Sequence, residues 1–406
     1  MTADAGAAAG SGSTAPAGAT APAGAPVDAR PLSIAYIGDP NSVHVQRWVA
    51  QFRGRGHRIA ILVPRNVAIA AVYPDDVAIE RYRPASDWRP SQLGLIGTSL
   101  SARRAVRRVH PDVVHVHHLT VNGLRAWMSG FHPYVVTVWG TDVLVEPARS
   151  RRSRFLARLA LRSADLVTGI SRHVVEAAVA CGARPERTRV IHFGIDTARF
   201  SPGPALAELC ERLDLAGRRV VFSPRLLEPI YRPDVVLDAV ARLPQDVCLV
   251  MTTYAAGPAA VAAVERRVAE LGLGERVRLV PGIPYSEMPD YYRLADVVVT
   301  VPESDAGPVT LVEALAVGKP VVASDLPPVR EWMADLDPGS LVAVGDVAAT
   351  AGALARALAR PAAQSSDLAA RGRARVLERA DERRTMAEME ALYRLLASGS
   401  LLESAR

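Results

Sequence analysis

The sequence predicts an α/β protein with two doubly wound parallel-sheet domains that face a central cleft. From residue 31 onward, short Val- and Ile-rich runs alternate with helical patterns. The alternation restarts at Arg219, after the segment RFSPG at 199–203. Apolar runs that are bounded by turn signals and separated by helices are typical of parallel sheets. Ligands bind outside the carboxyl ends of such strands, so a ligand site is expected in the cleft.

The expected elements follow the chain in order. In the first half, strands are expected at residues 33–37, 58–63, 113–116, 134–138 and 166–170, and helices at 43–55, 100–109, 151–162 and 173–180. In the second half, strands are expected at 220–223, 247–252, 276–279, 296–300 and 320–323, and helices at 233–242, 258–271, 288–294, 309–317 and 329–333. Beyond residue 344 the pattern is helical, with helices expected at 347–358, 364–377 and 381–396.

These patterns predict four segments. Residues 1–30 consist of Ala, Gly, Pro, Ser and Thr with almost no large apolar side chain, which predicts a disordered tail. Residues 31–203 form the expected first domain, and residues 204–380 form the second. Residues 381–406 contain a last helix that we expect to pack back onto the first domain.

Composition excludes several classes of protein. Aromatic residues make up only 5% of the chain, and no basic stretch is interleaved with them, which argues against nucleic-acid binding. No apolar run reaches the roughly 18 residues that a membrane-spanning helix needs, and the first 30 residues lack the pattern of a signal peptide. The three cysteines are far apart and have no metal-binding spacing, which fits a reducing compartment. We therefore expect a cytoplasmic protein.

The positive charge is almost entirely arginine. The formal net charge is +6, and Lys319 is the only lysine. Two arginine clusters, at 103–108 and 149–154, are by default solvated helix faces. A second hypothesis is that they dock on an anionic bilayer, which would place the protein at the inner face of the membrane.

The segment from 303 to 332 carries the strongest functional signal. Gly307 and Pro308 begin a predicted helix, because proline suits a first turn in which its missing N–H is not needed. We expect the N–H groups of Val309 and Thr310 to be free at the positive end of this helix. Such an end binds phosphate, which predicts a site for a nucleoside diphosphate.

Two carboxylates flank this helix start. Glu313 is expected on the flank of the helix, where it could accept hydrogen bonds from ribose hydroxyls. Asp305, on the other side of the phosphates, could accept hydrogen bonds from the sugar of the donor. The alternative is structural, with Asp305 as a turn residue and Glu313 on a solvated helix face.

Two arginines of the second half could neutralise phosphate oxygens. Arg225 follows the first strand of this half, so we expect it to point into the cleft. Arg232, in EPIYRPD, is a second candidate. Surface positions remain the alternative for both in a chain so rich in arginine.

The first half also supplies polar residues next to a strand end. Gly38 closes a tight turn after the first strand, and Asn41, Ser42 and His44 lie at the start of the next helix. We expect their polar groups to face the cleft. Helix capping is the alternative for Asn41 and Ser42, and a position on the helix surface is the alternative for His44.

Further polar residues follow later strands of the first half. Asp142 is either a base in the cleft or a cap of the next segment, and the two interpretations stay open. His115 and His117 share one strand face but have no acidic partner at a suitable spacing, so no metal site is expected. Phosphate-binding P-loop, dinucleotide and nucleophile-elbow motifs are absent from the sequence.

Together these motifs resemble a known family. The segments SDAGPVTLVEALAVGKPVVASDLPPVREW, PDVVHVHH, VVTVWGTDV, VIHFGIDTARFSP and MPDYYRLADVVVTVP are similar to those of the retaining glycosyltransferases of family 4. The resemblance covers about residues 33 to 396. It implies the GT-B fold, with two Rossmann-like domains. It also implies a nucleotide-sugar donor bound mostly by the second domain and an acceptor bound mostly by the first, without a metal requirement.

The resemblance also implies roles for individual residues. Asp305 and Glu313 occupy the positions of two family acids that bind the donor sugar and the ribose, although the first is usually Glu. Arg225 matches the phosphate-binding arginine, and Arg232 stands near the position of a lysine that this chain lacks. Trp139 replaces a frequent histidine, part of whose role Asp142 would carry.

The implied function is sugar transfer with retained anomeric configuration. A hexosyltransferase of this kind would use a UDP- or GDP-sugar and act on a glycolipid, a polysaccharide or a small glycoside, in cell-envelope or glycan biosynthesis. Its mechanism would be dissociative, with Arg225 stabilising the leaving diphosphate. Two alternatives share the fold: a sugar-nucleotide epimerase and a non-catalytic partner protein.

Overall fold

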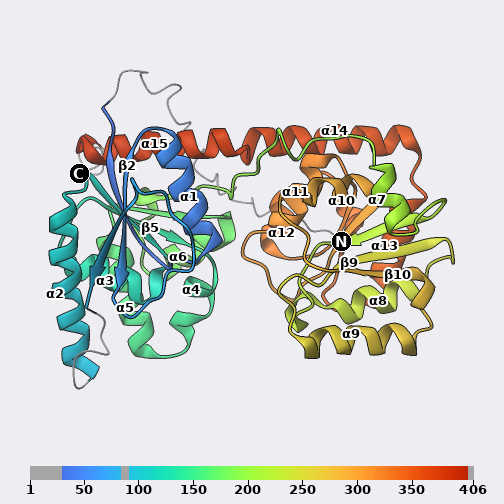
Figure 1. Ribbon diagram of the computed structural model, residues 1–406, viewed down its shortest axis with the longest axis horizontal. Coiled ribbons are helices and arrows are strands. Elements are labelled where there is room, and N and C mark those ends of the chain that lie inside the picture. Colours follow the sequence, from blue (N-terminus) through green and yellow to red (C-terminus); the bar gives the residue numbers. More distant parts are fainter. Residues whose placement is uncertain (1–29, 84–90, 401–406) are drawn as a thin grey trace, which may run out of the picture. The chain divides into compact units, whose positions relative to one another are not determined.

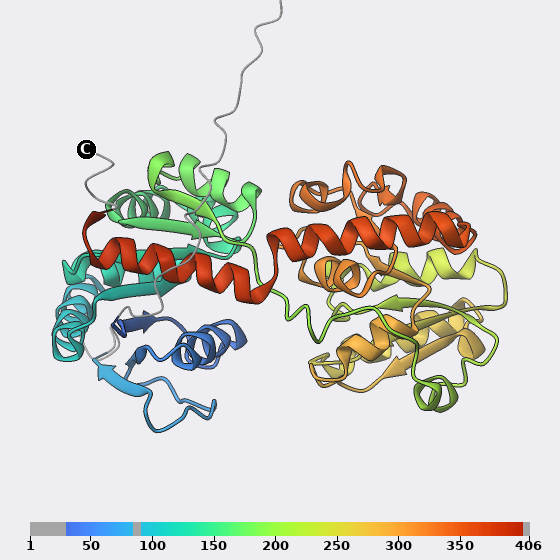
Figure 2. The same ribbon diagram turned by 90° about the horizontal axis from the view of Figure 1, so that it is seen from above.

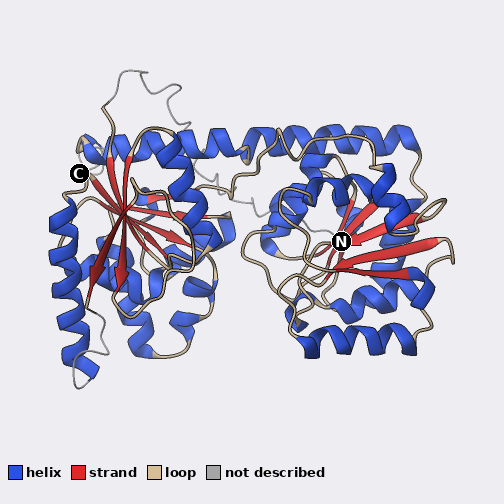
Figure 3. Ribbon diagram, viewed as in Figure 1, coloured by secondary structure: helices blue, strands red, loops and turns tan. Residues whose placement is uncertain are grey.

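The computed structural model describes residues 30–83 and 91–400. The expected disordered tail therefore lies, except for Arg30, outside the described residues. The described chain contains two parallel sheets with helices on both faces, as the sequence predicts (Figures 1 and 3). None of the described helices has the length and apolar character needed to cross a bilayer.

The first sheet has seven parallel strands in the order β3-β2-β1-β4-β5-β6-β7. They are β1 (Ser33–Ile37), β2 (Arg58–Pro64), β3 (Ala78–Tyr82), β4 (Val113–His117), β5 (Tyr134–Val138), β6 (Leu166–Gly169) and β7 (Thr188–Val190). The strand order reverses direction between β1 and β4. Functional residues should therefore follow these two strands, because open α/β sheets bind ligands at such a switch point.

Helices cover both faces of this sheet. Helix α1 (Val43–Gly54) and the last helix, α15 (Glu382–Ala397), share one hydrophobic cluster with the strands. On α1 the buried residues Val45, Trp48, Val49 and Phe52 recur at helical spacing. The other face packs against α2 (Ser91–Val109), α3 (Leu124–Ser129), α5 (Arg151–Ser163) and α6 (Arg172–Ala180). The end of the chain thus completes the core of the first domain (Figure 2).

The second sheet has six parallel strands in the order β10-β9-β8-β11-β12-β13. They are β8 (Arg219–Ser223), β9 (Val247–Thr252), β10 (Val277–Val280), β11 (Val297–Thr300), β12 (Val321–Ser324) and β13 (Leu341–Val342). One face packs against α7 (Ala207–Arg212), α10 (Met288–Leu294), α11 (Val309–Val317), α12 (Pro327–Met333) and α14 (Ala362–Arg379). The other packs against α8 (Pro233–Ala241), α9 (Pro258–Glu270) and α13 (Val347–Leu358).

Several elements of the structure differ from the expected ones. Strands β3 and β7 were not expected because both lie at sheet edges, where their residues are mostly not buried and the sequence shows no apolar run. Helix α2 begins at Ser91 and not at residue 100, because the glycines of its first turns weaken the helical pattern. A short helix, α4 (Thr141–Leu144), also follows β5.

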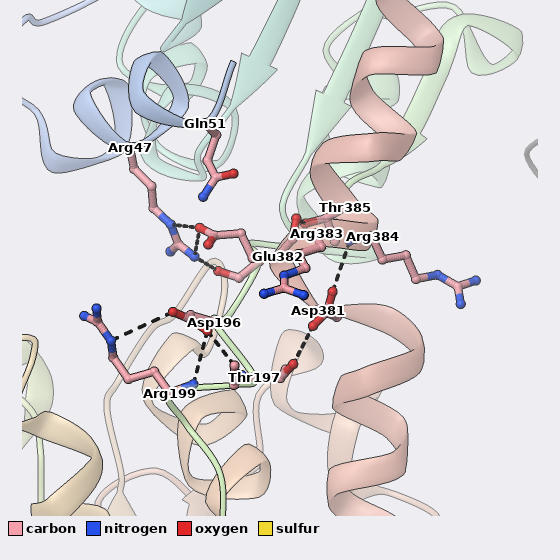
Figure 4. Close-up of polar contacts among 12 residues, drawn as sticks. Arg47, Gln51, Asp196, Thr197, Arg199, Asp381, Glu382, Arg383, Arg384 and Thr385 are labelled. Atoms are coloured by element: carbon pink, nitrogen blue, oxygen red, sulfur yellow. Dashed lines mark hydrogen bonds and ion pairs between the residues drawn. The ribbon is translucent and has the colours of Figure 1, made fainter. Parts of the chain in front are cut away.

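The chain passes twice between the two domains, and the two passages are hydrogen-bonded to each other (Figure 4). The Ile195 N–H donates to the Ala380 carbonyl at 2.7 Å, and the Glu382 N–H donates to the Ile195 carbonyl at 2.9 Å. Arg47 on α1 pairs with the Glu382 carboxylate at 2.5 Å and also donates to the Gly194 carbonyl. These bonds anchor the first turn of α15 to α1 and to the linker.

Candidate functional site

Residues at the ends of several strands from both sheets line a cavity of about 630 Å³. Six residues that the sequence predicted for the site line it: Ser42, His44, Arg225, Asp305, Gly307 and Val309. The expected location of the site at the carboxyl ends of the strands therefore agrees with the structure.

Arg225 is held in a fixed orientation at the floor of this cavity. It follows β8, and its Nε donates to the Thr300 hydroxyl at 2.9 Å, at the end of the neighbouring strand β11. Its Nη2 forms an ion pair with Asp305, and the guanidinium lies 5.1 Å from the centre of the Tyr231 ring. Among the residues that the structure describes, Nη1 has no acceptor. An anion in the cavity could bind this nitrogen.

Asp305 pairs with Arg225, a contact that the sequence analysis did not predict. It contacts the guanidinium directly, and its other oxygen accepts a hydrogen bond from the Gly307 N–H at 3.1 Å. The carboxylate therefore also acts as a turn residue, which was the structural alternative. The two interpretations are compatible because the two oxygens have different partners.

The helix start offers fewer free N–H groups than expected. The Val309 N–H donates to the Gly307 carbonyl at 2.8 Å, so the prediction that it is free was wrong. Thr310 N–H has no acceptor in the described part of the chain, and the buried Thr310 hydroxyl also lacks a partner. Helix α11 therefore presents a smaller donor group to a phosphate, centred on Thr310.

Glu313 is buried and not on a solvated flank. Only 4% of the residue is exposed, and the Tyr292 hydroxyl donates to its Oε2 at 2.8 Å. Burial raises the pKa of the Glu313 carboxyl to about 7, while hydrogen bonds from Tyr292 and Tyr285 oppose this shift. Glu313 lines a second cavity of about 830 Å³, which shares Val309 with the first. One elongated ligand could therefore occupy both cavities.

Arg232 does not join Arg225. Its guanidinium pairs with Asp234 at 2.8 Å and with Glu303 at 3.1 Å. It lines a separate cavity of about 650 Å³ between α8 and α9. The structure therefore contradicts the prediction that Arg232 contacts the phosphates, because its guanidinium already forms ion pairs with two carboxylates.

Asn41 and Gly38 serve the local structure of the first domain. The Asn41 amide donates to the Ala68 carbonyl at 2.8 Å and accepts from the Ala70 N–H at 2.7 Å, so it secures a loop and does not face the cavity. A side chain at Gly38 would come within 3.2 Å of the His117 Cβ. Gly38 is needed for packing and does not itself offer a ligand contact.

Asp142 caps the turn after β5, which resolves the two interpretations that the sequence left open. It is 1% exposed and accepts hydrogen bonds from three backbone N–H groups, those of Leu119, Trp139 and Gly140, at 2.9–3.0 Å. Asp142 does not line the 630 Å³ cavity but a separate cavity of about 320 Å³ beside α5. The prediction that it is a catalytic base was wrong.

His44 lines both cavities and stacks on Trp139, with ring centroids 4.2 Å apart. Its pKa is lowered to about 4, mainly by burial and further by the neighbouring charge of Arg47. His44 is therefore neutral at physiological pH. Ser42, the residue before α1, makes no side-chain capping bond, so its hydroxyl remains available to a ligand.

Several lining residues were not predicted, and His117 is the most informative of them. The sequence analysis placed His115 and His117 on one strand face, and a metal site was the only role that it considered for them. His115 instead contacts the hydroxyls of Tyr393 and Thr137, while His117 lines the cavity. Among the described residues, no group of three or more His, Cys, Asp or Glu side chains could hold a metal ion.

Comparison with known proteins identifies the family. The model of glycosyl transferase 4-like domains matches residues 33–171, and the model of glycosyl transferases group 1 matches residues 212–375. A D-inositol 3-phosphate glycosyltransferase of Jonesia denitrificans is 26% identical over 78% of this chain and 82% of its own length. One of Mycolicibacterium vanbaalenii is 35% identical, over 44% of this chain and 42% of its own length.

Solved structures agree in fold. Sucrose-phosphate synthase from Thermosynechococcus elongatus superposes with a TM-score of 0.74 at 22% identity, over 91% of this chain and all of that one. The Anabaena protein HepE, in complex with UDP and glucose, superposes with a TM-score of 0.72 at 20% identity, over 90% of this chain and all of that one. Since the two family models match successive parts of one chain with this fold, the protein belongs to the GT-B glycosyltransferases of the family 4 type.

Proposed function

We propose that the protein transfers a sugar from a UDP- or GDP-sugar to an acceptor hydroxyl, with retained anomeric configuration and without a metal ion. The observation that carries this proposal is the cluster of Arg225, Thr300 and Asp305 at neighbouring strand ends, beside the cavity that Glu313 lines. The structure of HepE with UDP and glucose supports a nucleotide-sugar donor in this fold.

Each of these groups has a chemical task in the proposed reaction. The ionised Glu313 carboxylate accepts hydrogen bonds from ribose hydroxyls, and the Thr310 N–H donates to a phosphate oxygen. Arg225 stabilises the charge that develops on the leaving diphosphate as the bond to the sugar breaks. Asp305 accepts from a sugar hydroxyl while it keeps Arg225 in place. The acceptor hydroxyl then attacks from the same face and loses its proton to the leaving phosphate.

A donor panel tests this proposal against its rivals. The full chain is incubated with UDP- and GDP-sugars, with and without a mixture of hydroxyl acceptors, and the products are separated by chromatography. We expect one donor to release its nucleotide faster once acceptor is added. An isomerised donor formed without acceptor would indicate an epimerase. Calorimetry that detects neither UDP nor GDP binding would indicate a non-catalytic partner protein.

We also propose that the protein works in the cytoplasm, in glycan or cell-envelope synthesis, and that α5 contacts an anionic membrane surface. Five exposed arginines lie on this helix, at positions 151, 152, 154, 158 and 162, and no ion pair joins them to any described carboxylate. Phe155 among them is 60% exposed. Each arginine near an anionic surface contributes about 1 kcal/mol, so the cluster could hold the protein there reversibly.

Flotation with lipid vesicles tests the membrane contact. We expect binding to vesicles that contain phosphatidylglycerol, loss of binding at high salt, and little binding to phosphatidylcholine alone. Replacement of Arg152, Arg154 and Arg158 by glutamine should abolish it. The same change at Arg103, Arg104 and Arg107 on α2 removes the same number of charges, so it is the matched control and should have a smaller effect. Equal binding to both vesicle types would contradict the proposal.

A further inference from the structure

The β11–α11 loop (residues 301–308) packs against the first domain. Ala306 contacts the hydrophobic cluster of the first sheet, although it belongs to the second half of the chain. Two glycines permit this close approach. A Cβ at Gly140, in the turn after β5, would lie 2.2 Å from the Ala306 Cβ, and a Cβ at Gly307 would lie 2.6 Å from the Ile170 Cδ1. The loop therefore lies between the turns that follow β5 and β6, at a distance that larger residues would prevent.

Ser171 connects this loop to the start of α6. Its hydroxyl donates to the Ala306 carbonyl at 2.7 Å and accepts from the Val174 N–H at 3.3 Å. The residue is fully buried, so bulk water does not compete for either bond. A single side chain therefore caps a helix of the first domain and also bonds to a loop of the second.

Glu331, on α12 of the second domain, caps the same helix from outside. Its Oε2 accepts from the Arg172 N–H and its Oε1 from the His173 N–H, both at 3.1 Å. The first N–H groups of a helix have no partners within it, and the positive end of the helix favours a carboxylate. Glu331 and Ser171 together satisfy the N–H groups of the first three residues of α6. The start of α6 is therefore complete only when the second domain is docked on the first.

The same loop holds the arginine of the candidate site. Asp305 precedes Ala306 in the chain, and one of its oxygens accepts from the Gly307 N–H at 3.1 Å while the other pairs with Arg225. A shift of the Ala306 carbonyl would therefore move the carboxylate that orients the guanidinium. Misplacement of a reacting group by about 1 Å can lower a rate about 100-fold, so a small shift of the loop is sufficient to affect catalysis.

We propose that Ser171 and Glu331 are positioning residues for the proposed sugar transfer. By docking the start of α6 on the second domain, they hold the β11–α11 loop so that Asp305 keeps Arg225 directed at the donor. Neither is among the described residues that line the 630 Å³ cavity, so they act through the loop and not on a substrate. This inference rests on the proposed function, because it names further residues that serve the same site.

Ser171→Ala, with Ser150→Ala as the matched control, tests the contact with the loop. Ser150 caps α5 by accepting from the Ser153 N–H at 3.0 Å, and both described partners of its hydroxyl belong to that helix. Each variant loses a helix cap, so both should lower Tm. Only Ser171→Ala should lower kcat, by about tenfold or more, because only this variant frees the loop. The Kd of UDP or GDP should change much less, and an equal loss of kcat in both variants would overturn the proposal.

Glu331→Ala tests the second contact, with Asp346→Ala as its control. Asp346 caps α13 within the second domain by accepting from the Ala349 N–H at 2.8 Å. We expect Glu331→Ala to lower kcat as Ser171→Ala does, and Glu331→Gln, which keeps one acceptor oxygen, to recover part of the activity. A loss of kcat in Asp346→Ala as large as that in Glu331→Ala would show a general effect of lost stability and refute the assignment.

A double variant separates positioning from a purely structural role. If Ser171 acts through Asp305, then Ser171→Ala/Asp305→Asn should be no slower than Asp305→Asn alone, because residues that act through one another are not additive. Losses of kcat that multiply in the double variant would contradict this path.

Hydrogen exchange followed by mass spectrometry measures the contact without any donor. Peptides that cover residues 301–309 should exchange faster in Ser171→Ala and Glu331→Ala than in the wild type, whereas Ser150→Ala and Asp346→Ala should leave them unchanged. If the wild type turns over no donor, the proposed function fails, while faster exchange in the first two variants alone still supports the contact. Equal exchange in all five proteins would overturn the positioning role whatever the activity.

Discussion

Replacement of Arg225 by alanine is expected to lower the kcat/KM of sugar transfer roughly 10²- to 10³-fold, the usual effect of removing one preorganised donor from developing charge. Arg225 is the one described cation that lines the central cavity, and Thr300 and Asp305 hold it there. Arg225→Lys should recover only part of the activity, because an ammonium group cannot contact Thr300, Asp305 and a phosphate in the same geometry.

Two controls separate catalysis from folding. Arg225→Ala leaves the Asp305 carboxylate without its partner, which itself destabilises the protein. The double variant Arg225→Ala/Asp305→Asn removes that charge and should regain Tm but not activity. Arg232→Ala is the matched arginine control and should stay within a few-fold of the wild type, because Arg232 pairs with Asp234 and Glu303. Near wild-type turnover of Arg225→Ala would refute the proposed role.

Nucleotide binding should tighten as pH rises from 6 to 8, through the titration of Glu313. Burial raises the pKa of this carboxyl to about 7, so part of the protein carries a protonated Glu313 at neutral pH. Ribose hydroxyls that donate to the carboxylate stabilise its charged form, so binding must release a proton. Below pH 7 the affinity should fall by up to about tenfold per pH unit. Calorimetry in buffers of different ionisation enthalpy measures the released proton.

Glu313→Gln is the control for this titration, and it also subtracts the protonation of the nucleotide itself. The variant should bind nucleotide more weakly at pH 8 and lose the pH dependence that belongs to the protein.

The stability of the fold should change with pH in the opposite direction to the affinity for nucleotide. A folded-state pKa above the usual 4.5 stabilises the fold below pH 4.5, and this contribution is lost as pH rises through 7. At pH 8 the variant should therefore unfold at a higher temperature than the wild type. A pH dependence shared by both proteins would exclude Glu313 as its source.

The sequence predicts the interior of both sheets well because their strands are buried on both faces. Residues 33–37, 134–138 and 247–252 read as largely apolar runs and are strands with those bounds. The edge strands β3 and β7 have no such run, since half of their surface needs no apolar side chain. Helix α11 departs from the expectation that Glu313 lies on a flank of the helix. Residues 311–317 are all buried, which also excludes the structural alternative of a solvated helix face for Glu313.

The location of the candidate site could be predicted from the sequence. The contacts between its side chains could not. The positions of Arg225 and Asp305 follow from strand ends and spacing, whereas their direct contact joins residues 80 positions apart. Asp142 and Arg232 were misassigned for a related reason. A charged residue looks the same in a sequence whether its partner is a substrate, three backbone N–H groups or two carboxylates, and only the fold brings these partners together.

The packing of α15 also has a consequence for protein synthesis. Met386, Met389 and Tyr393 complete the hydrophobic cluster on one face of the first sheet, although they follow the second domain in the sequence. The second domain is fully synthesised before these residues leave the ribosome. The domain made first must therefore wait with part of one face of its sheet uncovered until α15 has been synthesised.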